Sequence, residues 1–161
     1  MTRRHRSPMY RTRRWTSIAV AAAILAGLVL ASAAGASNGS LRTTLRNWSA
    51  TIGVDAHSVA LAAQNRHPRR MVASARRFRV DSLKARAAIS RQRGSTAAGR
   101  QAKRLAVIAF ADYAAAGSLW TASGQARLKG QKATASRYAR SAAIRAKAGN
   151  RSLLKAGRLL P

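Results

Sequence analysis

The chain has 161 residues, of which 31 are lysine or arginine and only three are acidic, so its formal net charge is +28. Glutamate and cysteine are absent, which excludes disulfides, thiolate metal sites and a cysteine nucleophile. The length suits one domain with a modest core. So large a charge cannot be neutralised within the chain, and its surface must carry a strong positive potential.

The N-terminal segment has the three parts of a secretory signal. Residues 1–14 carry six arginines and no acid, Ile18–Leu30 is an apolar run of 13 residues, and the small residues 31–36 follow. This order of a basic, an apolar and a small-residue segment is typical of an export signal. Cleavage is expected after Ala33 or Ala36, so residues 1–36 are interpreted as a signal peptide or an anchor.

An uncleaved membrane anchor is the main alternative. Residues 15–34 are largely apolar, long enough to cross about 30 Å of hydrocarbon and to hold the chain at the membrane. In both cases the arginine cluster stays cytoplasmic and the rest is exported, so residues 37–161 form a single extracytoplasmic domain, rich in alanine and arginine. The pair Arg13-Arg14 favours a twin-arginine signal only weakly, because no hydrophobic pair follows it.

Beyond this segment, apolar residues spaced three and four apart predict amphipathic helices. The first begins near Leu41 and is expected to be interrupted near Gly53, with Asp55 capping its continuation. The second runs from Pro68, which suits the first helical position, to about Arg93. The expected core seam of this second helix contains Met71, Ala75, Phe78, Ser82, Ala85 and Ile89.

The longest of these helices is predicted over Ala98–Ala126, with Ser95 as its N-cap. It carries two stripes, so it is expected to contact more than one neighbour, and glycine favours a bend near Ser123-Gly124. The first stripe contains Ala98, Ala102, Leu105, Ile108 or Ala109, Ala116, Leu119, Ser123 and Ala126. The second contains Phe110, Tyr113, Gly117, Trp120 and Gly124. An alternative places a membrane segment at Leu105–Trp120, but a charged residue within it makes insertion costly.

Two of the aspartates have simple structural explanations. Asp112 lies within the first stripe, where no residue three or four positions away can pair with a carboxylate. Because an unpaired buried charge is costly, we expect Asp112 to form an ion pair with a cation of another helix. Asp81 has Arg77 four residues before it and Lys84 three residues after it, so pairs within one helix account for it.

A last helix is predicted from about Lys132 to Leu159, after Gly130. Small residues dominate its seam, so we expect it to pack closely on its neighbour. The seam contains Ala135, Ala139, Ala142, Ala146, Gly149, Leu153, Ala156 and Leu160. The predicted fold class is therefore all-α, a small antiparallel bundle of three to four helices.

Groups suited to catalysis or metal binding are few. The histidines His5, His57 and His67 have no cysteine or glutamate near them in the sequence, so the spacing of metal ligands is missing. A carboxylate acid/base pair would need aspartates from different helices to converge. We expect no enzyme activity, no metal and no cofactor.

The arginine-rich helix faces remain, and arginine binds phosphate bidentately. Without the six arginines of residues 1–36, the net charge falls from +28 only to +22. We therefore expect salt-sensitive binding to anionic envelope polymers or phospholipid head groups. A protein-interaction module and a sequence-independent nucleic-acid-binding protein are the alternatives. The candidate contact residues are Arg69, Arg70, Arg76, Arg77, Arg86, Arg137, Arg140 and Arg145.

Overall fold

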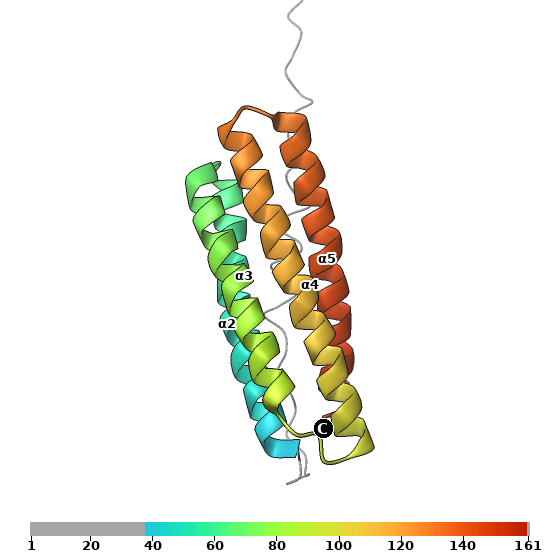
Figure 1. Ribbon diagram of the computed structural model, residues 1–161. Helices are drawn as coiled ribbons and strands as arrows, with labels where there is room; N and C mark the ends of the chain where they lie inside the picture. The colour runs from blue at the N-terminus through green and yellow to red at the C-terminus, as the bar shows by residue number, and fades with distance from the viewer. Residues whose placement is uncertain (1–37, 161) are drawn as a thin grey trace, which may run out of the picture.

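The computed structural model describes residues 38–160, in which four α-helices and no strand are present. The predicted signal segment lies outside the described residues. The helices are α2 (Gly39–Gln64), α3 (Pro68–Arg91), α4 (Ala97–Leu128) and α5 (Lys132–Arg158). They alternate in direction and are joined by short connections (Figure 1). The predicted all-α antiparallel bundle is confirmed.

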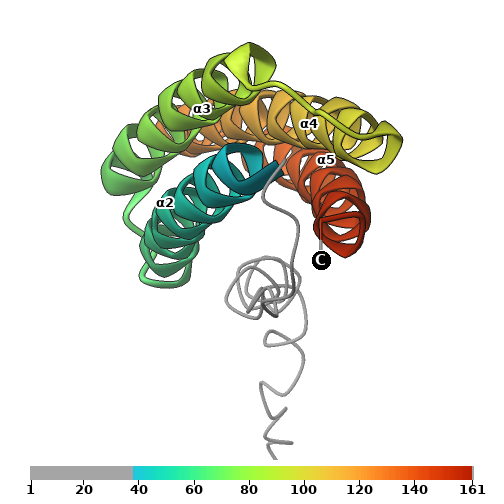
Figure 2. The same cartoon turned by 90° about the horizontal axis from the view of Figure 1, so that it is seen from below.

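The four helices form a curved row, with α2 at one end and α5 at the other (Figure 2). Each helix packs chiefly on its neighbours along the chain, so α2 lies on α3, α3 on α4, and α4 on α5. The α2 helix also touches α4 at a few positions, whereas α2 and α5 are not a packed pair within residues 38–160. The α4 helix thus has an extensive neighbour on each of two sides, as its two stripes predict.

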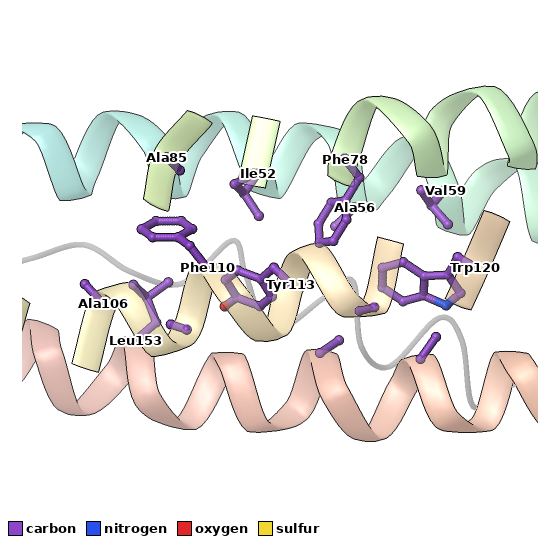
Figure 3. Close-up of a cluster of buried hydrophobic side chains, with 14 of the residues drawn as sticks. Ile52, Ala56, Val59, Phe78, Ala85, Ala106, Phe110, Tyr113, Trp120 and Leu153 are labelled. Atoms are coloured by element: carbon purple, nitrogen blue, oxygen red, sulfur yellow. The ribbon is translucent and has the colours of Figure 1, made fainter. Parts of the chain in front are cut away.

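The core is centred on the aromatic residues of α4. Phe110, Tyr113 and Trp120 are all buried. The ring of Phe78 from α3 meets those of Tyr113 and Trp120 edge-on, with centroids 6.0 and 5.3 Å apart (Figure 3). On the other side, the Tyr113 hydroxyl donates a hydrogen bond to Asn150 Oδ1 of α5 at 2.6 Å. Tyr113 therefore contacts both neighbours of the central helix.

The predicted seams of the second and last helices are confirmed. All six residues predicted for α3 are buried, and so are all eight predicted for α5 and the residues just after it. On α4 the second stripe is wholly buried, but the first is covered less completely. Ile108 is 51% exposed, while its neighbour Ala109 is fully buried. Three- and four-residue spacing therefore located the core faces of these helices.

One predicted irregularity, the interruption of the first helix near Gly53, is wrong. The α2 helix passes through Gly53 without a break, because Ile52 and Ala56 around it are both held in the core. The α4 helix is likewise continuous through Ser123 and Gly124, which are both buried, and the bend expected there stays a prediction. In each case burial of the flanking face outweighs the loss of about 1 kcal/mol in helix propensity that a glycine brings.

The connection between α3 and α4 is held by side-chain hydrogen bonds. Thr96, one residue later than predicted, caps α4, and its Oγ1 accepts from the Gly99 N–H at 3.0 Å. Ser95 instead donates its backbone N–H to Asn38 Oδ1 at 3.1 Å. Asn38 Nδ2 in turn donates to Thr96 Oγ1 at 3.0 Å. The start of α2 is therefore tied to the start of α4.

One described helix, α4, is long and apolar enough to cross a membrane by length and composition alone. It contains the predicted segment Leu105–Trp120. A helix packed between two neighbours must also be apolar on two sides, and the two stripes of α4 face α3 and α5. The place of α4 between α3 and α5 accounts for the apolar residues of its two stripes.

Glycines allow close approach of the backbones on both sides of α4. A Cβ atom added to Gly117 would lie 2.8 Å from Arg79 Cβ and 3.0 Å from Arg79 Cα on α3. A Cβ added to Gly149 of α5 would lie 2.7 Å from Tyr113 Cε1. Only a residue without a side chain fits at these distances, so the two contacts of the central helix both require glycine.

We expect the substitution Gly117→Ala to lower the free energy of unfolding by about 1–3 kcal/mol. The added methyl group meets the backbone of Arg79, which cannot move aside as the end of a flexible side chain can. Gly39→Ala is the matched control, since no atom lies within 4 Å of a Cβ at that position. Denaturant unfolding followed by circular dichroism measures both variants. Equal unfolding midpoints would contradict the close α3–α4 contact.

Candidate anion-binding surface

All three aspartates lie in the described part of the chain, and each is in an ion pair. Asp112 Oδ1 on α4 lies 3.2 Å from Arg145 Nη1 on α5. The carboxylate is largely covered, with 17% of its side chain exposed, whereas the arginine side chain is 59% exposed. The expected partner from another helix is therefore present, and it is one of the candidate contact arginines.

The carboxylates of Asp55 and Asp81 converge where α2 packs on α3. Arg77 Nε lies 3.1 Å from Asp55 Oδ1 and 3.7 Å from Asp81 Oδ2. Lys84 Nζ lies 3.2 Å from Asp81 Oδ1. The two pairs of Asp81 within α3 follow the prediction. The predicted capping role of Asp55 is wrong, because this residue lies inside α2 and its side chain, only 3% exposed, is paired with α3.

The pKa of Asp55 is raised to about 6, chiefly by burial. A hydrogen bond with the Asp81 side chain and the negative charge of Asp81 contribute to this rise, and the positive charge of Arg77 opposes it. Loss of hydration disfavours the ionised form, and here the nearby guanidinium only partly compensates for it. Asp55 is therefore a carboxyl group that titrates close to neutral pH.

The candidate arginines of α3 do not form one site. A helix turns by about 100° per residue, so Arg69 and Arg76, seven apart, share the outward side. Arg70 and Arg77 lie on the side that faces α2, where Arg77 is already in ion pairs. Arg86 lies roughly 90° from the outward pair, on the side that faces α4. The cations of α3 are thus divided among three sides.

The cations of α5 are instead gathered on one face. Six exposed cations fall within an arc of about 80° that lies opposite the buried seam. These residues, which we call the α5 basic face, are Arg137, Arg140, Lys147, Arg151, Lys155 and Arg158. None of the six is in an ion pair with a carboxylate of residues 38–160. The α5 helix itself contains no acidic residue.

Only two members of the α5 basic face, Arg137 and Arg140, are among the predicted contact residues. The candidate Arg145 lies beside the face and pairs with α4. The four members that the prediction missed stand at fixed helical positions relative to the alanine seam. Projection of that seam on a helical wheel would have identified them from the sequence.

Other chemistry has little support in the described residues. No three side chains of histidine, cysteine, aspartate or glutamate are grouped there so that they could hold a metal ion. His57 and His67 are exposed, and His5 lies outside the described range. The chain matches no protein-family model, and comparison with curated proteins and with solved structures gave no match either.

The raised pKa of Asp55 makes stability depend on pH. Between its ordinary value of 3.8 and about 6, Asp55 is protonated in the folded chain but ionised in the unfolded chain. The folded state then binds more protons, so this contribution to stability is complete below pH 3.8 and is lost as the pH rises through 6. We expect the urea midpoint of the full chain to fall between pH 5 and 7.5, and Asp55→Asn to remove that fall.

Two variants serve as controls for this pH dependence. Asp112→Asn removes the other interhelical carboxylate, and His57→Gln removes an exposed titratable group two residues away on α2. Both should retain the slope of the unmodified chain. A midpoint that rises with pH, or a slope that survives in Asp55→Asn, would contradict the assignment. Carbon-13 spectra give a direct check, since the chain has only three side-chain carboxyl groups.

Proposed function

We propose that this chain is an exported, non-enzymatic helical protein that binds anionic polymers or phospholipid head groups of the cell envelope. One observation carries the proposal. The three carboxylates are all engaged in ion pairs with Arg77, Lys84 and Arg145, so within residues 38–160 they leave the α5 basic face without a paired carboxylate. A surface of this kind attracts phosphate-bearing partners through long-range electrostatics.

The compartment is inferred from the N-terminal segment. Its order of arginines, an apolar run and small residues is that of an export signal, whether or not the segment is cleaved. Outside the plasma membrane, the abundant anions are head groups, wall polymers and free nucleic acid. If the signal is an anchor, residues 15–34 also bring the basic helices close to the membrane surface.

The absence of an enzymatic role is part of the proposal. Convergence of Asp55 and Asp81 provides two carboxylates from different helices, which is the arrangement that acid/base chemistry requires. Both are held in ion pairs, however, and the side chain of Asp55 is 3% exposed. A substrate would have to displace Arg77 and separate α2 from α3 to reach this group. We therefore interpret the pair as structural.

A protein-interaction module is the alternative, with specificity in an apolar interface. The aromatic stripe of α4 does not favour it, because Phe110, Tyr113 and Trp120 are buried between neighbouring helices. The larger apolar side chains that remain exposed are spread over all four helices, as is ordinary for a soluble surface. Electrostatic binding is therefore the better supported function.

We expect the affinity for inorganic polyphosphate to fall by about 10²- to 10³-fold between 50 and 200 mM salt, because about six contacts each release counterions. Fluorescence anisotropy with a labelled polymer at several salt concentrations measures this. A neutral polymer of similar length is the control and should not bind. An affinity that is the same at both salt concentrations would indicate an apolar interface and contradict the proposal.

The compartment has its own test. We expect intact-mass analysis of the exported fraction to find a chain that begins near Ala34 or Ser37, or an intact chain in the membrane fraction. These two results distinguish a cleaved signal from an anchor, and both agree with export. An intact, soluble chain inside the cell would contradict the proposed compartment and favour sequence-independent binding to nucleic acid.

A further inference from the structure

The outward cations of the bundle differ in arrangement from helix to helix, and this difference indicates where a partner binds. We infer that the α5 basic face binds an extended, linear phosphodiester polymer along the length of the helix. This inference rests on the proposed function for the sign of the partner's charge. The binding surface and the shape of the partner follow from the structure.

The face is a row of single cations. From Arg137 to Arg158 it extends over about 32 Å, since each residue adds about 1.5 Å. Neighbouring cations are three or four residues apart, which corresponds to steps of about 5 Å. The one wider step contains Ile144, which is 68% exposed. A long, narrow row with regular steps fits a polymer that carries one phosphate per repeat, more closely than it fits a compact anion.

The α5 basic face is also free of opposing charge. The α5 helix has no acidic residue, and the nearest carboxylate on the neighbouring helix, Asp112, is paired with Arg145 at the seam. Because α5 is the last helix of the row and packs chiefly on α4 (Figures 1 and 2), no other described helix covers its outward side. All six cations of the α5 basic face can therefore contact one partner.

The outward side of α3 lacks such a row. Its exposed cations are Arg69, Arg76, Lys84 and Arg91, which are seven or eight residues apart, and Lys84 is already in an ion pair with Asp81. Between Arg76 and Arg91 lie about 22 Å of helix, where the outward side presents Val80 and Leu83, 46% and 41% exposed. A linear anion on α3 would therefore meet cations about 11 Å apart, roughly twice the step of the α5 basic face, and one of them is already paired with Asp81.

A membrane surface fits the α5 basic face less well than a polymer. Helices that lie on a bilayer bury a continuous apolar face beside their cations. Here Ile144 is the only large apolar residue within the face, and the leucine and alanine seam of α5 is buried. Phe78, Phe110, Tyr113 and Trp120 are buried, and the exposed Tyr138 lies about 100° around α5 from Arg137, outside the α5 basic face. Recognition should therefore depend on the phosphates and be independent of sequence.

The test compares two charge-matched variants of the full chain. One carries Arg→Gln at three positions of the α5 basic face, and the other carries the same change at three exposed positions of α3. Glutamine keeps a similar helix propensity, and both variants lose the same charge. The probe is a single-stranded oligothymidylate, a phosphodiester polymer without secondary structure. The α5 substitutions are at Arg140, Arg151 and Arg158, and the α3 substitutions are at Arg69, Arg76 and Arg91.

We expect the α5 variant to lower the slope of log affinity against log salt by about two, which corresponds to about a 100-fold loss at 0.1 M salt. The α3 variant should lose several-fold at most. Equal losses in the two variants would overturn the inference in favour of diffuse attraction, while leaving the proposed function intact. Binding to anionic vesicles without binding to the oligonucleotide would overturn the polymer as partner. No binding to either probe would overturn the proposed function itself.

Three further measurements keep the result independent of folding. Circular dichroism melts of each variant show whether the bundle is intact. If the α5 variant fails to fold, the single substitution Arg151→Gln should still reduce the salt slope by about 0.7, and Arg76→Gln should leave it nearly unchanged. Replacement of the same three α5 arginines by lysine should keep most of the affinity. Loss of binding with lysine would show that charge along this face is not what binds.

Discussion

Close packing on both sides of α4 is the constraint on which the rest of this structure depends. Gly117 admits the backbone of α3, and Gly149 of α5 admits the ring of Tyr113. Seams made of alanine and glycine bury less apolar area per residue than leucine-rich seams do, so each contact contributes less free energy. Long helices compensate by making many such contacts along their length. Because close seams leave no room between helices for long side chains, the cations must lie on outward faces or at the edges of the seams.

The few carboxylates of the chain are placed where positively charged helices must approach one another. Asp55 and Asp81 lie at the contact of α2 with α3, and Asp112 lies at the contact of α4 with α5. Their partners are mostly exposed, so each pair contributes little net stability. They do reduce the repulsion between like charges that face each other across a seam. The α3–α4 contact has no carboxylate, and there the aromatic rings of Phe78 and Trp120 supply the contact instead.

Much of this fold could be predicted from the sequence, because buried residues recur with the period of the helix. Every seam residue that this period predicted on α3 and α5 is buried, although Asn150 and Gly157 of α5 are buried as well. The period could not show whether Gly53 ends a helix. Helix propensity depends on the local sequence, whereas the burial of Ile52 and Ala56 depends on how α2 packs on its neighbours. Nor could the period pair Asp55 with Arg77, because a contact between residues 22 positions apart depends on the register of two helices. The α5 basic face was partly predictable, since outward positions follow once a seam is known, whereas the division of the α3 cations required knowledge of both its neighbours.

The position of α3 in the row of helices explains how its cations are arranged, but the position of α5 does not explain why its cations are so many. A helix between two neighbours has only narrow strips of surface left, so its cations are distributed to its edges and one outward side. The two end helices have the broadest free surface, because each packs chiefly on one neighbour. Yet α2 carries only Arg42 and Arg46, whereas α5 carries eight cations and no acid. Solubility would be satisfied by either composition, and the repulsion among the cations of α5 costs stability. The cations are concentrated on the helix at one end of the row in spite of this cost in stability. A face that binds a linear anion requires such a concentration of positive charge.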